Sequence, residues 1–126
     1  MTDPKSRNPV ALVVDDDPDM LVTLVRCLES AGYHVLAAGS GDEVERMAAE
    51  ADRIDVLVTD MYLGDGWGGQ VAFRVQQTHP GSGVVFISGH TREDPVLRHG
   101  IQDHMVFLEK PFTLDELAEA VLRARS

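Results

Sequence analysis

The amino-acid sequence predicts one α/β domain built on a doubly wound parallel sheet. Short aliphatic runs, typical of buried parallel strands, alternate along the chain with segments of helical periodicity. Such alternation implies right-handed crossovers between parallel strands, with helices on both faces of the sheet. The strand order 2-1-3-4-5 fits a chain of 126 residues. The first and third strands are then adjacent, at the switch point where ligands bind.

Five aliphatic runs are the predicted strands, and each is bounded by polar or turn-forming residues. The third run is the clearest, because a β-branched and aliphatic stretch stops at Asp60 and is followed by a glycine-rich loop over residues 61–69. The five strands are expected over residues 9–14, 34–38, 54–59, 84–88 and 105–108.

Capping patterns place the predicted helices between these strands. Asp17 before Pro18 is suited to cap a helix with proline at its first position. Capping boxes at residues 40–43 and 113–116 open two further helices. Another helix is expected over residues 70–78, and a short one of one or two turns over part of residues 90–104.

The composition limits the class of protein. A net charge of −10 disfavours nonspecific binding to nucleic acid and suits a basic partner or a cation. No apolar run approaches the roughly 20 residues needed to span a bilayer, and residues 1–9 lack the apolar core of a signal peptide. The single cysteine, Cys27, suits a reducing cytoplasm. We expect a polar tail over residues 1–9 and one domain over residues 10–126.

Polar side chains stand at the carboxyl ends of four predicted strands. Asp15 and Asp16 follow the first strand, Asp60 the third, Ser88 ends the fourth, and Lys110 follows the fifth. Three carboxylates brought together repel one another and need a cation, and Mg²⁺ prefers such oxygen ligands. A hydroxyl and an ammonium opposite them suit a phosphoryl group. The central carboxylate, Asp60, is then the candidate nucleophile, which forms an aspartyl phosphate.

Other interpretations of these residues remain open at this point. An acidic run after a strand is commonly a solvated turn or a helix cap, and Lys110 taken alone is a surface lysine. One alternative function is a small Mg²⁺-dependent phosphohydrolase that uses Asp15 as nucleophile and Asp17 as acid, although the chain leaves little room for a substrate-selecting cap. Another is an interaction module without phosphoryl chemistry, which does not explain why all these side chains are present.

The sequence resembles the receiver domain of two-component response regulators, from about Val10 to Arg125. This resemblance implies a flavodoxin-like (βα)5 fold and a single receiver domain over residues 10–126. The stretch after Ser88 is more similar to receivers associated with hybrid sensor histidine kinases than to those of transcription factors. The motifs that carry the resemblance cover residues 12–18, 56–63, 84–90 and 107–112.

The resemblance assigns the chemistry of the site. It makes Asp60 the phosphoacceptor, which receives a phosphoryl group from a phosphohistidine of a sensor kinase or a histidine phosphotransfer protein. It makes Asp15 and Asp16 the metal pair, with Asp16 preferred as the direct ligand. Asp60 and the backbone carbonyl of Tyr62 complete the site, which takes Mg²⁺ and for which Mn²⁺ can substitute.

The resemblance also assigns the switch. Ser88 matches the hydroxyl that moves toward the phosphoryl group, and Phe107 matches the aromatic position that turns inward with it. Lys110 pairs with a phosphoryl oxygen, and the peptide bond before Pro111 is typically cis in the family. The protein is then a switch that assists its own phosphorylation and dephosphorylation, and not a metabolic enzyme.

The implied setting is a cytoplasmic signalling pathway. The expected partners are the phosphodonor protein and an unknown downstream protein, without direct nucleic-acid binding or membrane insertion. We expect a monomer or a weak dimer, and the start at Met1 favours a stand-alone regulator.

Several residues depart from the family pattern. Phe107 lacks the hydroxyl of a tyrosine, and Gly64 stands where a proline is common. With three further glycines nearby, this loop is expected to be more mobile than usual, and Trp67 is expected beside the site. Residues 90–104 lack the usual alanine-rich fourth helix, which puts signalling through the common dimer face in doubt. His90 could influence how water reaches the aspartyl phosphate, whereas the five histidines show no zinc-ligand spacing.

Overall fold

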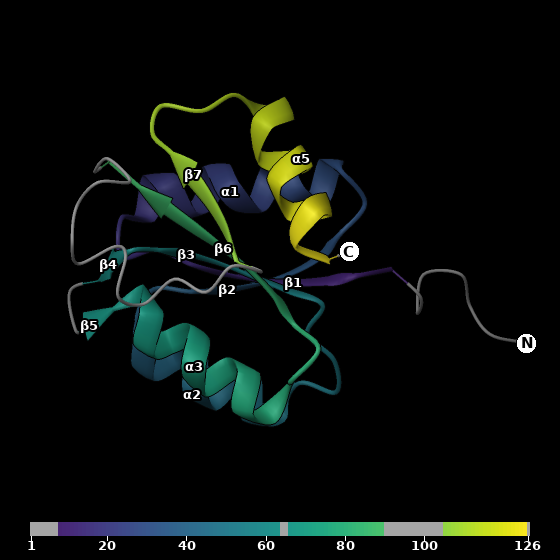
Figure 1. Ribbon diagram of the computed structural model, residues 1–126, viewed down its shortest axis with the longest axis vertical. Coiled ribbons are helices and arrows are strands. Elements are labelled where there is room, and N and C mark those ends of the chain that lie inside the picture. Colours follow the sequence, from purple (N-terminus) through teal and green to yellow (C-terminus); the bar gives the residue numbers. More distant parts are fainter. Residues whose placement is uncertain (1–7, 64–65, 90–104, 126) are drawn as a thin grey trace, which may run out of the picture.

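The computed structural model describes residues 8–63, 66–89 and 105–125, and a five-stranded parallel sheet forms its centre (Figure 1). Every neighbouring pair of strands in this sheet is parallel. From one edge to the other, the strands are β2 (His34–Ala38), β1 (Val10–Val14), β3 (Val56–Asp60), β6 (Gly83–Ser88) and β7 (Val106–Glu109). The predicted strand order 2-1-3-4-5 is confirmed, with β6 and β7 as the fourth and fifth strands of this sheet.

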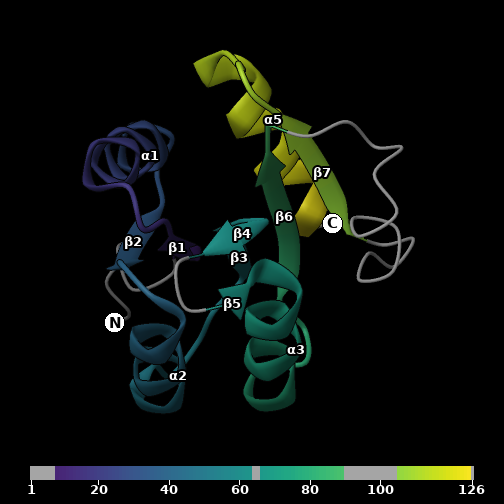
Figure 2. The same cartoon turned by 90° about the vertical axis from the view of Figure 1, so that its left-hand side faces the viewer.

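Helices cover both faces of the sheet, as the views in Figures 1 and 2 show. Helices α1 (Pro18–Ser30) and α5 (Leu114–Arg125) pack on one face, and α2 (Gly41–Glu50) and α3 (Gly68–Thr78) pack on the other. None of these described helices has the length and apolar character needed to cross a bilayer. The short fourth helix predicted within residues 90–104 lies outside the described residues.

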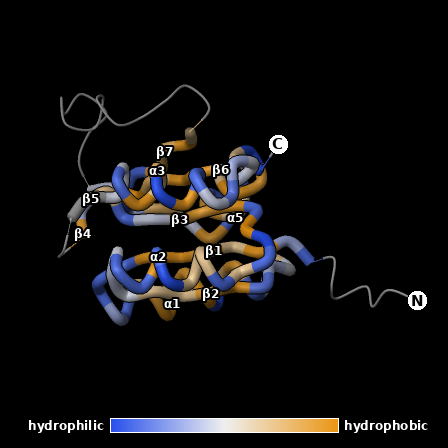
Figure 3. The backbone as a smooth tube through the Cα atoms, turned by 90° about the horizontal axis from the view of Figure 1, so that it is seen from below, coloured by the Kyte–Doolittle hydropathy of each residue, from blue (hydrophilic) through white to orange (hydrophobic). Residues whose placement is uncertain are grey.

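The hydrophobic core consists of two layers separated by the sheet. Successive side chains of a strand point to opposite faces. Leu12 and Val14 therefore join the layer beneath α2 and α3, whereas Ala11 and Val13 join the layer beneath α1 and α5. All four are fully buried. Figure 3 shows hydrophobic residues concentrated along the strands, as expected for a parallel sheet covered on both sides.

The predicted helix caps are present. The Asp17 carboxylate accepts a hydrogen bond from the backbone N–H of Asp19 at 3.0 Å, with proline at the start of α1. Ser40 caps α2. At α5, Thr113 Oγ1 accepts from the Glu116 N–H at 3.1 Å, and Glu116 Oε1 accepts from the Thr113 N–H at 2.9 Å. The latter pair is a complete capping box.

The segment predicted as a loop over residues 61–69 contains regular structure, so that part of the prediction is wrong. Strands β4 (Tyr62–Leu63) and β5 (Gly66–Trp67) form an antiparallel hairpin, and α3 begins directly afterwards at Gly68. The Gly68 N–H donates to the Met61 carbonyl at 2.7 Å and closes the hairpin. A glycine-rich stretch hid this local pairing, because glycine has no side chain to signal a strand.

Candidate functional site

The sheet brings the predicted polar residues to one edge. Asp60 is the last residue of β3, Ser88 is the last residue of β6, and Asp15 and Lys110 directly follow β1 and β7. These four strands are neighbours in the sheet. Because they are all parallel, their carboxyl ends meet at the same edge.

The Asp60 carboxylate is held through both of its oxygens. Oδ2 lies 3.2 Å from the ammonium Nζ of Lys110 and accepts a hydrogen bond from it. Oδ1 accepts from the backbone N–H of Tyr62 at 3.1 Å. The Asp60 side chain is 15% exposed and that of Lys110 is 34% exposed. The carboxylate is therefore fixed in orientation and still reachable from solvent.

Lys110 is positioned by the backbone of the neighbouring strand. Its N–H donates to the carbonyl of Ser88 at 2.9 Å, which extends the pairing of β6 with β7 to the site. The peptide bond from Lys110 to Pro111 is cis, as the family resemblance implies.

Asp15 is a buried carboxylate that is only partly satisfied. It is 1% exposed, and its Oδ1 accepts from the Asp17 N–H at 2.9 Å. Its Oδ2 has no hydrogen-bond partner among the described residues. Burial raises the pKa of Asp15, and the negative charges of Asp60 and Asp16 add to the rise, against the lowering effects of the Asp17 N–H and Lys110. A cation beside Oδ2 would satisfy this oxygen.

The residues present fit a magnesium ion that keeps part of its water shell. Within the described ranges, no three side chains of His, Cys, Asp or Glu are grouped as a metal site. Asp16 is exposed beside the buried Asp15. An ion at this edge would therefore draw further ligands from a backbone carbonyl and from water, which is common for Mg²⁺.

The two predicted switch residues occupy neighbouring strands. Ser88 is 1% exposed at the end of β6. Phe107, on β7, is half-buried opposite Phe86 and packs against the core layer beneath α2 and α3. The side chain of Trp67 and the whole of His90 lie outside the described residues, so the predictions for them stay predictions.

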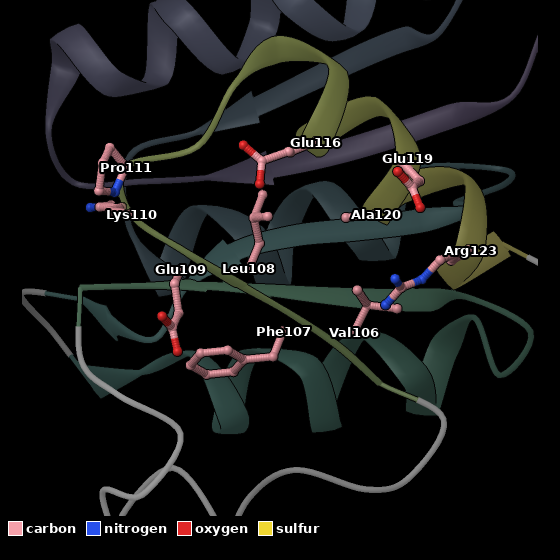
Figure 4. Close-up of a pocket in the computed structure, with 10 residues that line it drawn as sticks. All are labelled: Val106, Phe107, Leu108, Glu109, Lys110, Pro111, Glu116, Glu119, Ala120 and Arg123. Carbon is pink, nitrogen blue, oxygen red and sulfur yellow. The ribbon is translucent and has the colours of Figure 1, made fainter.

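A groove of about 560 Å³ runs between β7 and α5 and begins at the site. Figure 4 shows Lys110 and Pro111 at one end of this groove, and Val106 and Arg123 at the other. The Phe107 side chain points away from α5 in this view. The groove therefore joins the lysine that contacts Asp60 to the surface of the last helix.

Two residues at the site were missed from the sequence. The hydroxyl of Thr59 donates to the carbonyl oxygen of Asp60 at 3.0 Å, although Thr59 is fully buried in β3. Gly68 lies so close to Asp60 that a side chain there would collide with the same carbonyl. The available signal was a polar residue within an aliphatic strand, directly before the candidate nucleophile.

The sequence pattern of the family described as "Response regulator receiver domain" matches residues 11–122. The chain belongs to this family. A receiver domain is a phosphoacceptor switch of two-component systems, and receiver domains interact with sensor kinases and downstream effectors. The fold and the resemblance predicted from the sequence are both confirmed.

Known relatives of this receiver domain include sensor kinases and transcriptional regulators. It is 34% identical over 118 residues to the sensor kinase CckA of Brucella abortus, covering 92% of this chain and 12% of CckA. It is 32% identical over 110 residues to the transcriptional regulatory protein GlrR of Escherichia coli K12, covering 87% of this chain and 24% of GlrR. The chain thus spans a quarter or less of the length of these two relatives.

The fold is also similar to that of solved receiver structures. The response regulator receiver protein from Sinorhizobium medicae superposes with a TM-score of 0.83 and 33% sequence identity, covering 96% of this chain and 99% of that one. The similarity to a receiver of known structure therefore extends over nearly the whole of both chains.

Proposed function

We propose that this receiver domain accepts a phosphoryl group on Asp60 from a phosphohistidine of a sensor kinase or a histidine phosphotransfer protein. The observation that carries the proposal is the environment of the Asp60 carboxylate. It ends a central strand, is partly exposed, and has both oxygens oriented by Lys110 and by the Tyr62 N–H. A carboxylate fixed in this way is a preorganised nucleophile.

In the proposed reaction, a carboxylate oxygen of Asp60 forms a bond to phosphorus while the N–P bond of the phosphohistidine breaks. The imidazole nitrogen leaves with the electron pair of that bond, and the product is an acyl phosphate. Lys110 is already within contact distance of the carboxylate, so its charge is in place to balance a phosphoryl oxygen. Phosphoryl transfer depends mostly on such positioning and charge balance.

The proposed metal site uses Asp15, Asp16, Asp60 and the carbonyl of Tyr62. The buried Oδ2 of Asp15 supports it, because this oxygen has no partner among the described residues. When bound, Mg²⁺ supplies charge that offsets the repulsion between the carboxylates and the incoming phosphoryl group, and Mn²⁺ can replace it. The residues of the chain contribute the oxygens and hold them at one edge.

The proposed switch begins at Ser88 and Phe107. The Ser88 hydroxyl moves to donate a hydrogen bond to the phosphoryl group, and Phe107 turns further inward from its half-buried position. Both residues lie on the pair β6 and β7, and the groove beside β7 continues to α5. A rearrangement at the site can therefore alter the surface that a downstream protein contacts.

The phosphohydrolase alternative finds less support. It requires the Asp17 carboxylate as an acid, yet that carboxylate caps α1 by accepting the Asp19 N–H. The role of a switch, and not of a metabolic enzyme, agrees with the family. An interaction module without phosphoryl chemistry does not account for the contact between Lys110 and Asp60.

The proposed setting follows from the phosphodonor. A kinase phosphohistidine is formed from ATP, so the domain is proposed to act in the cytoplasm. The proposed domain organisation is one receiver domain over residues 10–126 with a polar tail over residues 1–9. The charge of −10 disfavours direct contact with nucleic acid. The exposed large apolar side chains of the described helices are spread over α1, α3 and α5, which suits a monomer or weak dimer.

A donor with a P–N bond tests the proposal directly. Phosphoramidate and Mg²⁺ are added to the protein, the product is reduced with borohydride, which converts an aspartyl phosphate to homoserine, and the modified peptide is identified by mass spectrometry. The proposal predicts modification at Asp60 alone. Modification at Asp15 supports the phosphohydrolase instead. An unmodified protein that also fails to bind beryllium fluoride supports the interaction module.

A further inference from the structure

We infer that Thr59 and Gly68 are positioning residues for the phosphoacceptor, acting through the peptide unit between Asp60 and Met61. This inference rests on the proposed function of Asp60. Both contact the main-chain carbonyl of Asp60. The orientation of this peptide unit sets the direction of the Asp60 side chain and the position of Tyr62.

Thr59 carries a hydroxyl at a buried strand position where packing alone would favour a methyl group. It lies in β3 after three aliphatic residues and is fully buried. Burying a hydroxyl without a hydrogen bond is costly, and valine has nearly the same shape. Here Thr59 Oγ1 donates to the carbonyl oxygen of Asp60 at 3.0 Å. The hydroxyl therefore has a specific partner, and that partner belongs to the phosphoacceptor.

The same peptide unit is held at its other end by the neighbouring strand. The Met61 N–H donates to the carbonyl of Ile87 at 2.8 Å. A peptide unit is planar, so bonds to its carbonyl and to its N–H together fix its orientation. The Cα–Cβ bond of Asp60 starts from one end of this plane. The next residue after the plane, Tyr62, donates its N–H to the Asp60 carboxylate.

Gly68 lies against the Asp60 carbonyl and leaves no room for a side chain there. A Cβ at this position would collide with the Asp60 carbonyl oxygen and would lie 3.2 Å from Thr59 Cγ2. The Gly68 N–H also donates to the Met61 carbonyl at 2.7 Å. The backbone of Gly68 thus covers the peptide unit that Thr59 and Ile87 orient, and only glycine permits this approach.

The matched pair Thr59→Val and Thr59→Ser tests the inference. Thr59→Val keeps the shape and removes the hydroxyl, whereas Thr59→Ser keeps the hydroxyl. The probe is acetyl phosphate with Mg²⁺, and the rate constant of phosphorylation is corrected for the folded fraction. We expect Thr59→Val to be about 10- to 100-fold slower than wild type, as for a displaced reacting group, and Thr59→Ser to retain most of the rate.

Ser82→Ala is the matched control. Ser82 is buried, and its Oγ donates to the Ile54 carbonyl at 2.7 Å, before the start of β3 and far along the strand from Asp60. This variant loses a bond of the same kind, so it is expected to lower stability and to leave the rate unchanged. Should Thr59→Val fail to fold, the pair Thr59→Ala and Thr59→Ser provides the same comparison.

A second measurement separates this inference from the proposed function. Amide hydrogen exchange of Tyr62, without any phosphodonor, is expected to be faster in Thr59→Val than in wild type or Thr59→Ser. If wild type is not phosphorylated at Asp60 but the exchange result holds, the proposed function fails and the positioning of Asp60 stands. Equal rates and equal exchange in Thr59→Val and wild type overturn the inference, and so does a Thr59→Ser variant as slow as Thr59→Val.

Discussion

Lys110 Nζ lies 3.2 Å from Asp60 Oδ2, although 50 positions separate the two residues in the sequence. The contact arises from the sheet, because β3 pairs with β6 and β6 pairs with β7 in parallel register. The hydrogen bond from the Lys110 N–H to the Ser88 carbonyl then positions the Lys110 backbone at the edge of the sheet. The cation is therefore already beside the Asp60 carboxylate, the proposed phosphoacceptor.

Replacing Lys110 is expected to impair chemistry far more than stability. In Lys110→Met, phosphorylation by acetyl phosphate should slow by about 100-fold, the scale observed when a preorganised charge-stabilising group is removed. The free energy of unfolding should change by about 1 kcal/mol or less, because the pair is partly exposed to solvent. Rates by intact mass and urea titrations check both parts. A rate equal to that of wild type contradicts the role of the lysine.

Removing the charge of the buried Asp15 by substitution is expected to increase the stability of the protein in a pH-dependent way. Its raised folded-state pKa means that the folded protein holds the proton more tightly than the unfolded chain does, so its contribution to stability falls as the pH rises above the ordinary value of 3.8. At pH 7, without divalent cations, Asp15→Asn should raise the free energy of unfolding by about 1 kcal/mol, because it removes a negative charge that is buried and is repelled by Asp60 and Asp16.

This gain should disappear below pH 3.8, where the wild-type carboxyl is protonated in both states. Urea titrations in EDTA at several pH values provide the measurement. Asp16→Asn is the matched control, because Asp16 is exposed and its neutralisation should change stability little. A gain that is the same at all pH values, or that Asp16→Asn reproduces, contradicts the explanation from burial.

Magnesium should stabilise the folded protein through the same residues. A ligand that binds only the folded state adds about 2.7 kcal/mol at 100 times its Kd. The urea midpoint of wild type should therefore rise with Mg²⁺, and the rise should be largely lost in Asp15→Asn and Asp60→Asn. The assignment of the metal ligands is wrong if both variants respond to Mg²⁺ as wild type does.

Much of the fold and the site was predictable, because the signals were local in the chain. An acidic residue at the end of a predicted parallel strand, such as Asp60, must lie at the carboxyl edge of the sheet. Once the strand order is known, Asp15, Ser88 and Lys110 are predicted to lie at the same edge, beside Asp60. The capping boxes are equally local, since Thr113 and Glu116 contact each other within one helical turn.

The features that were missed depend on contacts that spacing does not reveal. The hairpin of β4 and β5 forms in a glycine-rich stretch without strand periodicity. That Oδ2 of Asp15 has no partner in the described part of the chain depends on the surrounding packing. The bond from Thr59 to the Asp60 carbonyl is short in sequence, but a threonine in a strand is ordinary until its hydroxyl is located.

Gly68→Ala is expected to disturb the site from the hairpin side. The added methyl group must push against the Asp60 carbonyl, so the variant should be destabilised by about 1–3 kcal/mol, as for overpacking. Its phosphorylation by acetyl phosphate should also slow. Gly81→Ala is the control, because a Cβ at Gly81 meets no atom of the described residues within 4 Å. Thermal unfolding together with the phosphorylation rate checks the prediction, and matching behaviour of the two variants contradicts it.

The most direct test of the central claim is the intact mass of the protein after incubation with acetyl phosphate. Wild type and Asp60→Asn are compared with and without Mg²⁺. We expect a gain of one phosphoryl mass that requires Mg²⁺ and is absent in Asp60→Asn. A gain that survives in Asp60→Asn would contradict the assignment of Asp60 as the phosphoacceptor. So would no gain in wild type, provided that a phosphoryl mimic such as beryllium fluoride also fails to bind.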